Sequence, residues 1–208
     1  MTRRDAFTLL ELLVTTAIIA VLGLLTLAGA RGVKSTWEQT IDLSNLRAIG
    51  GGCGMYAADN NMALPRVSKD ADSWTRMIWH YIPNEKLFAS PSDPRNCLRT
   101  KKPIYALENN TSYVMNGFSD LGDYSTPSFA PRVSMVDKPG STILVCLRSF
   151  NAGDRYLDLA FGDHKTVGDY RRYNNGSVYL MVDGSSRRIR FSDYDHALWL
   201  AEKDWKIP

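Results

Sequence analysis

The chain has 208 residues, of which 44% are hydrophobic and 23% are charged. These proportions are near the average of globular proteins, so they exclude a wholly disordered, collagen-like or coiled-coil chain. The formal net charge of +3, from 25 basic and 22 acidic residues, is too mild to indicate a nucleic-acid partner, and we expect none. The mean hydropathy of −0.24 averages two different parts, because the strongly apolar sequence is concentrated in the first thirty residues.

An uncharged apolar segment runs from Leu12 to Ala30. As a helix it is roughly 28 Å long, which matches a bilayer core of about 30 Å. Arg3 and Arg4 precede it, and the positive-inside rule then keeps the N-terminus in the cytoplasm and the rest of the chain outside. Glu11 lies at the start of this stretch, where an ionised carboxylate is costly unless it is paired.

Three interpretations of this segment compete. A secretory signal peptide would be cut after the small residues Ala28-Gly29-Ala30, but the apolar run exceeds the usual length of about 7 to 15 residues. A plain signal anchor would simply stay in the membrane. Neither of these explains Glu11, whereas ionisable residues at membrane depth usually have a function.

The third interpretation is an assembly segment, and the stretch from Arg3 to Val14, RRDAFTLLELLV, resembles the class III leader of type IV prepilins and type II secretion pseudopilins. The resemblance implies that prepilin peptidase cleaves between Ala6 and Phe7 and then methylates the new amine of Phe7. Most relatives have Gly where this chain has Ala6. Glu11 becomes the fifth mature residue, the family's acidic position. In a filament it could pair with the Phe7 amine of a neighbour, and a buried pair of this kind fixes register.

The helical pattern continues beyond the membrane segment. Leu46, Ile49, Cys53 and Tyr56 follow 3-4-3 spacing, which predicts an amphipathic stripe. Several glycines interrupt this helix, each at a cost of about 1 kcal/mol, and glycine is tolerated where another element packs close. The turn residues Asp59-Asn60-Asn61 are expected to end it.

The remaining sequence predicts loops and a hairpin. Residues 60–137 are rich in Pro, Asn, Asp and Ser and predict loops with short helical or strand pieces, such as Ser73–Tyr81. Ile143–Leu147 predicts a buried strand, and residues 151–172 predict a long surface loop. Ser177–Val182 and Ser185–Phe191 predict two strands joined by the turn Asp183-Gly184.

Later segments are similar to a bacterial subgroup of pilin-like proteins that has a C-terminal signature of His, nine residues and Asp-Gly. Here Tyr173 stands where the His would be, followed by nine residues and Asp183-Gly184. We interpret this motif as structural. Relatives often carry a pair of cysteines where this chain has Asp42 and Ser90, so no disulfide is expected at these positions.

Little catalytic or metal chemistry is indicated. Cys53 and Cys146 fall on apolar positions and are expected to be core thiols, which leaves Cys97. The histidines are scattered, at positions 80, 164 and 196. The loop from Asp154 to Asp169 carries acids that could hold Ca²⁺, but basic residues are interspersed and solvated charges are the favoured interpretation. We expect no metal, no cofactor and no catalytic site.

The sequence therefore predicts an α+β protein whose long N-terminal helix packs on a small antiparallel sheet with long loops. We expect a leader at residues 1–6, a transmembrane and assembly helix at 7–30, its continuation at 31–58 and an extracytoplasmic head at 59–208. The resemblance implies a subunit of a type II secretion pseudopilus or type IV pilus-like filament, single-pass in the inner membrane. Its partners would be prepilin peptidase and other pilin-like subunits. The alternative is an anchored periplasmic enzyme or binding protein, which an exposed cleft with convergent polar groups would favour.

Overall fold

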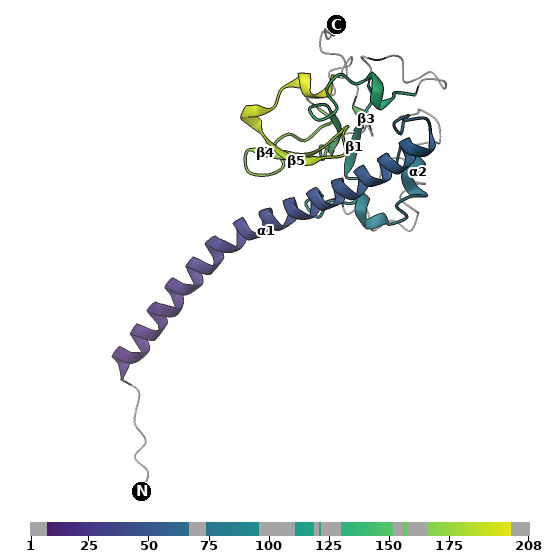
Figure 1. Ribbon diagram of the computed structural model, residues 1–208. Coiled ribbons are helices and arrows are strands. Elements are labelled where there is room, and N and C mark those ends of the chain that lie inside the picture. The colour runs from purple at the N-terminus through teal and green to yellow at the C-terminus, as the bar shows by residue number, and fades with distance from the viewer. Residues whose placement is uncertain are drawn as a thin grey trace. The chain divides into compact units, whose positions relative to one another are not determined.

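The computed structural model describes residues 8–66, 74–95, 111–118, 121, 130–151, 156–157 and 166–200, apart from the side chains of 26–31, 156, 196 and 197. The chain divides into two compact units, Met1–Trp37 and Glu38–Pro208. Helix α1 (Leu9–Asp59) begins in the first unit and ends in the second (Figure 1).

In the first unit, α1 exposes apolar side chains on every side. Leu9 is 82% exposed, and no residue from Thr8 to Leu25 is buried. The other large apolar side chains that are exposed here are Leu10, Leu12, Leu13, Val14, Ile18, Ile19, Val21, Leu22, Leu24, Leu25, Val33 and Trp37. Burying these apolar side chains requires contacts that the first unit by itself does not provide. Within the described residues, no helix combines the length and the apolar character needed to cross a membrane.

In the second unit, the C-terminal part of α1 packs against the rest of the head. Leu46, Ile49 and Cys53 are buried, and Tyr56 is partly buried, which confirms the predicted stripe. The helix ends at Asp59, as predicted, and the backbone amide of Met62 closes the end by donating to the carbonyl of Ala57 at 2.8 Å.

The sheet of the second unit has the strand order β3-β1-β2-β4-β5. Its strands are β1 (Tyr113–Asn116), β2 (Ile143–Leu147), β3 (Tyr156–Leu157), β4 (Gly176–Met181) and β5 (Ser186–Arg190). Strands β1, β2, β4 and β5 pair antiparallel, whereas the short β3 pairs parallel with β1. An N-terminal helix followed by a small antiparallel sheet is a pilin-like arrangement, and the predicted α+β class is confirmed.

The predicted hairpin and the predicted strand at Ile143–Leu147 are confirmed as β4–β5 and β2. Strands β1 and β3 were not predicted, because they lie inside segments that read as loops. All four residues of β1 are buried, so its sequence lacks the polar and apolar alternation that marks a half-exposed strand. Helix α2 (Trp74–Trp79) is a helical piece within the predicted Ser73–Tyr81.

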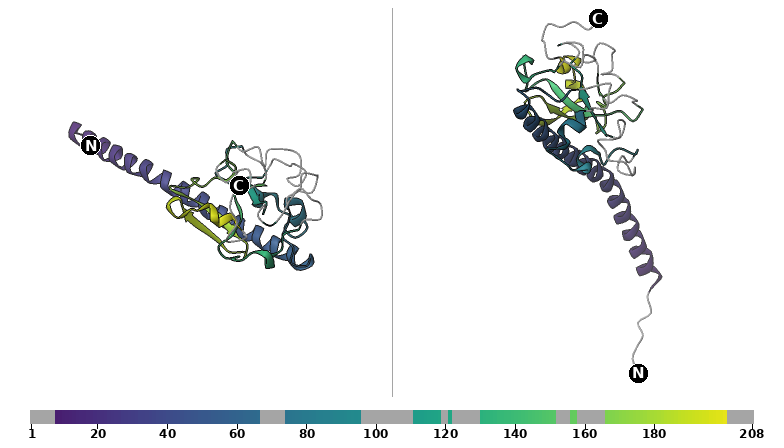
Figure 2. Two further views of the ribbon diagram at one scale, coloured as in Figure 1. Left: turned by 90° about the horizontal axis from the view of Figure 1, so that it is seen from above. Right: turned by 90° about the vertical axis from the view of Figure 1, so that its right-hand side faces the viewer.

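Strands β1, β2 and β4 of the sheet are buried on both faces, whereas the edge strand β5 is largely exposed. On one face Val178 and Leu180 join the core cluster that contains Leu46 and Ile49 of α1. On the other face, a second cluster contains the β4 side chains of Tyr179 and Met181, together with Trp199 of the 3₁₀ helix η8 (His196–Trp199). The two additional views show that the C-terminal part of α1 runs beside the sheet (Figure 2).

Candidate functional site

Glu11 lies in the first turn of α1 and forms a capping box with Thr8. The Thr8 amide and hydroxyl both donate to Glu11 Oε2, at 2.9 and 2.8 Å, and the Glu11 amide donates to Thr8 Oγ1 at 3.2 Å. These reciprocal bonds satisfy donors that would otherwise be unpaired at the start of the helix. The sequence signal was Thr-x-x-Glu before an apolar run, and the prediction for Glu11 did not use it. Ala6 and Phe7 lie outside the described residues, so the cleavage site stays a prediction.

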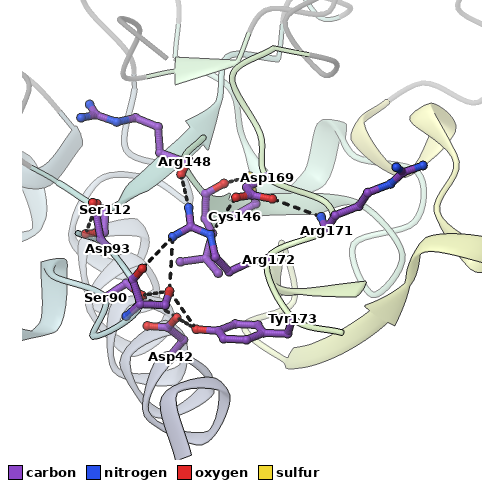
Figure 3. A network of polar contacts seen from close by, with 12 residues as sticks. Asp42, Ser90, Asp93, Ser112, Cys146, Arg148, Asp169, Arg171, Arg172 and Tyr173 are labelled. Atoms are coloured by element: carbon purple, nitrogen blue, oxygen red, sulfur yellow. Dashed lines mark hydrogen bonds and ion pairs between the residues drawn. The ribbon is translucent and has the colours of Figure 1, made fainter. Parts of the chain in front are cut away.

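A buried carboxylate, Asp42, is the centre of a polar cluster in the second unit (Figure 3). Its side chain is 0% exposed and accepts hydrogen bonds from Ser90 Oγ at 2.7 Å, from Tyr113 Oη at 2.8 Å and from Tyr173 Oη. We call these four residues the Asp42 cluster. They come from α1, from the segment after the 3₁₀ helix η1 (Glu85–Phe88), from β1 and from the segment before β4.

Burial and neighbouring charges determine which groups of the Asp42 cluster carry protons. Burial raises the pKa of Asp42, although the three hydroxyl donors and the positive charge of Arg172 act in the opposite direction. Burial and the neighbouring Asp42 charge raise the pKa of both Tyr113 and Tyr173. Both phenols therefore stay protonated and keep donating to the carboxylate at neutral pH.

Arg172 holds the surroundings of the cluster in place. Its guanidinium donates to Asp169 Oδ2 at 2.7 Å, to the carbonyl of Arg148 at 2.6 Å and to Ser92 Oγ at 3.3 Å. Ser92 Oγ in turn lies 2.8 Å from Ser90 Oγ and accepts from Tyr173 Oη at 3.1 Å. Two of the three donors to Asp42, Ser90 and Tyr173, thus contact Ser92, and the third, Tyr113 Oη, accepts from Asn45 Nδ2 at 3.1 Å.

Three positions that were singled out in the sequence, Asp42, Ser90 and Tyr173, meet in this cluster. The residues were visible in the sequence, but their mutual contact was not.

Asp183 and Gly184 form the turn between β4 and β5. Gly184 has a φ of +85°, a left-handed conformation that favours glycine, and Asp183 Oδ1 accepts from the Ser185 amide at 2.9 Å. A Cβ on Gly50 of α1 would lie 3.2 Å from the Gly184 carbonyl oxygen. Tyr173 and Gly184, at the two ends of the C-terminal motif, therefore both meet α1, eight residues apart at Asp42 and Gly50.

An apolar groove of about 260 Å³ lies beside α1 in the second unit. It is lined by Gly50, Cys53, Gly54, Ala57, Met62, Leu64, Val133, Leu144, Val182, Asp183 and Gly184. Asp183 is the one charged residue in this lining. The groove lacks the convergent polar groups that a catalytic cleft would need.

The other candidate groups are placed as follows. Cys53 and Cys146 are buried and free, as predicted, and burial raises the pKa of Cys53 to about 12. Asp169 is bound to Arg172 at the end of the loop considered for calcium. The rest of that loop's acids, Asp154, Asp158 and Asp163, lie outside the described residues, as do Cys97 and His164; His80 is exposed. In the described part of the chain, no three His, Cys, Asp or Glu residues are grouped to hold a metal ion.

Asp93 is a second buried carboxylate near the cluster. It is 6% exposed, forms an ion pair with Arg95 at 2.5 Å and accepts from Ser112 Oγ at 2.8 Å. Burial acts to raise its pKa, but the bonds from Arg95 and Ser112 outweigh burial and lower the pKa from 3.8 to about 2.

Asp93 should therefore stabilise the head above pH 4, and this stabilisation should be lost as the pH falls from 3.8 to about 2. The loss should be about 2 kcal/mol, because a tenfold change in proton affinity is worth about 1.4 kcal/mol. We expect Asp93→Asn to flatten the decline of the unfolding free energy between pH 4 and pH 2, measured by denaturant titration. Asp193→Asn, which removes the exposed partner of Arg190, is the control: the pKa of Asp193 is lowered by its bonds to Ser192 and Arg190, but solvent screens this exposed pair, so the variant should flatten the decline much less than Asp93→Asn. An equal decline in wild type and Asp93→Asn would contradict the prediction.

Residues 1–27 match the family model of the prokaryotic N-terminal methylation motif. No match is found among curated proteins or among solved structures. The matched stretch includes Ala6, Phe7 and Glu11 and ends before the Asp42 cluster.

Proposed function

We propose that this chain, whose residues 1–27 match the prokaryotic N-terminal methylation motif and so include a prepilin-type leader, is a structural subunit of a type II secretion pseudopilus or a type IV pilus-like filament. The carrying observation is that the leader runs directly into a helix whose apolar side chains are exposed on every side from Leu9 to Leu25. A helix of this kind is suited to burial among copies of itself. Through the filament the protein would take part in protein secretion.

Before assembly, the apolar segment Leu12–Ala30 would hold the subunit in the inner membrane as a single span. Arg3 and Arg4 would keep the N-terminus in the cytoplasm, where prepilin peptidase acts, and the head would lie in the periplasm. Cleavage between Ala6 and Phe7 would remove both arginines and leave an amine at the start of the mature chain.

Assembly would then use Glu11 and the Phe7 amine of a neighbouring subunit. Both bonds that the Glu11 side chain accepts within the capping box go to Oε2, which leaves Oε1 to accept from the amine of a neighbour. The same carboxylate would thus begin its own helix and fix the register of the next subunit, because an unpaired charge in an apolar bundle costs several kcal/mol.

The head supports a structural role over the alternative of an anchored enzyme or binding protein. Among the described residues, the carboxylates Asp42 and Asp93 are buried and paired inside the head, and the groove beside α1 is apolar. Neither feature presents an exposed set of converging polar groups to a substrate.

The N-terminus of the protein purified from membranes tests this proposal. Intact mass and N-terminal sequencing should show a chain that begins at N-methylated Phe7. Ala6→Gly, which restores the residue most relatives have, is the control and should be cut at the same bond. A chain that begins at Arg31 would identify a signal peptide, and an uncut Met1 would identify a plain anchor; either result would overturn the proposal.

A further inference from the structure

Strand β5 forms one edge of the sheet (labelled in Figure 1). It pairs with β4 on one side, and among the described residues no strand pairs with its other side. All of its residues except Ile189 are partly or fully exposed. An edge strand of this kind presents unpaired backbone groups with which another extended chain can pair.

The register of β4 and β5 indicates which backbone groups face outward. At one end the Ser185 carbonyl accepts from an amide of β4, and at the other end the Phe191 amide donates to a carbonyl just before β4, both at 2.8 Å. Along an antiparallel strand, residues that bond to the partner alternate with residues whose groups face away. Positions 187 and 189 therefore bond toward β4, and Ser186, Arg188 and Arg190 direct their backbone amides to the free edge.

Arginines make this edge strongly basic. Arg187, Arg188 and Arg190 are all exposed. Among the described residues, only Arg190 of the three forms an ion pair, with Asp193 at 3.0 Å, and both of these side chains remain more than half exposed. Arg188 donates to the carbonyl of Asn174 at 2.7 Å. Most of the positive charge on β5 is therefore not neutralised by the described part of the head.

The three arginines lie on both faces of the strand, because successive side chains point to opposite sides. Arg188 and Arg190 share the face of Ser186, whose Oγ donates to a carbonyl of α1 at 3.3 Å. Arg187 lies on the opposite face, with the buried Ile189. A strand added to this edge would therefore need acidic side chains opposite Arg188 and Arg190 on one face and opposite Arg187 on the other.

A fourth arginine extends the charge beyond the end of β5. The guanidinium carbon of Arg171 lies 3.8 Å from the centre of the exposed Phe191 ring, and Tyr170 stacks on the same ring with the centroids 5.5 Å apart. A guanidinium that stacks on a ring keeps its N–H groups directed outward in the plane of the stack. The end of the edge therefore carries an oriented set of hydrogen-bond donors.

We propose that the free edge of β5 binds an acidic extended segment of another protein, which adds to the sheet as an antiparallel strand. The outward backbone groups would supply affinity, and the arginines would select for carboxylates. A second copy of β5 would be a poor partner, because it would place arginine opposite arginine. This binding would be independent of filament assembly through Glu11.

A peptide designed for this register tests the proposal on the full-length protein in detergent. In acetyl-Glu-Val-Glu-Glu-Thr-amide the three carboxylates would lie opposite Arg190, Arg188 and Arg187, and the titration of a fluorescent form measures the affinity. N-methylation of the third residue removes the N–H that would donate to the Arg188 carbonyl, and it should weaken binding at least about tenfold. N-methylation of the second residue, whose N–H would face away from β5, is the control and should leave the affinity unchanged.

Exchange of charge provides a second readout. Arg187→Glu should weaken binding of the peptide at least about tenfold, and a peptide with Lys as its fourth residue should restore it. Arg132→Glu makes the same change at an exposed position in the segment that bridges to Ala63, and it should bind nearly as wild type does. Equal affinity of the two N-methylated peptides would overturn the proposal, because charge alone would then attract the peptide. Absence of peptide binding to the wild type would overturn it as well.

Discussion

Replacing Glu11 by alanine is expected to stop filament assembly while the protein still inserts into the membrane. The change leaves the Phe7 amine of the neighbouring subunit without its carboxylate in an apolar bundle, at a cost of about 3 to 5 kcal/mol. Because about 1.4 kcal/mol corresponds to a factor of ten, the equilibrium for subunit addition should fall at least about a hundredfold. The measurement compares the filament fraction sheared from cells with the amount of protein in the membrane fraction.

The capping box makes it possible to separate the charge of Glu11 from its helix-starting role. Glu11→Gln keeps a side-chain oxygen that accepts from Thr8 but removes the charge, and it should be as defective as alanine. Thr8→Ala keeps the charge and removes the cap, which costs about 1 kcal/mol, so assembly should be reduced only slightly. Normal assembly of Glu11→Gln would show that Glu11 acts as a cap and not as an ionic partner.

Gly50→Ala and Gly51→Ala are expected to change the stability of the head in opposite directions. An added methyl at Gly50 would meet Leu180 Cδ1 at 2.7 Å and the Gly184 carbonyl at 3.2 Å. The leucine side chain can move, but the backbone carbonyl of the turn cannot, so we expect a loss of about 1 to 3 kcal/mol from overpacking. At Gly51 nothing lies within 4 Å, and alanine should gain up to about 1 kcal/mol from helix propensity.

The unfolding free energies of the two variants, from urea titration of the protein in detergent, measure this difference. Since both substitutions change the same residue type at adjacent positions of one helix, the propensity gain is shared and the difference reports the contact with the hairpin. Equal gains at both positions would mean that the turn at Asp183-Gly184 does not press against α1.

Features encoded by local periodicity were predictable from the sequence. Three features depend only on residues that are close together in the sequence. They are the stripe of Leu46, Ile49 and Cys53, the end of α1 at Asp59 and the β4–β5 hairpin. The sequence signal of the leader also lies within one short stretch, and the family match covers residues 1–27.

Features that depend on distant residues were not predictable in the same way. Tyr173 reaches Asp42 across 131 positions of the chain, and no spacing rule connects them. Strand β1 is recognised by its pairing with β2 and β3, because its four residues are buried and carry no alternation. A buried polar contact of this kind depends on which segments the fold brings together.

The capping box at Thr8 and Glu11 bears on the electrostatics of the N-terminus that cleavage would create. With Thr8 at the helix start, cleavage would leave a single residue, Phe7, between the new cationic amine and the first turn of α1. The aligned peptide dipoles put partial positive charge at that end, so the helix repels the amine by about 0.3 to 1 kcal/mol, and more where water is excluded. The carboxylate of its own Glu11 offsets part of this dipole. Processing would thus produce a cation that the dipole of its own helix opposes, which favours an additional carboxylate supplied by another subunit.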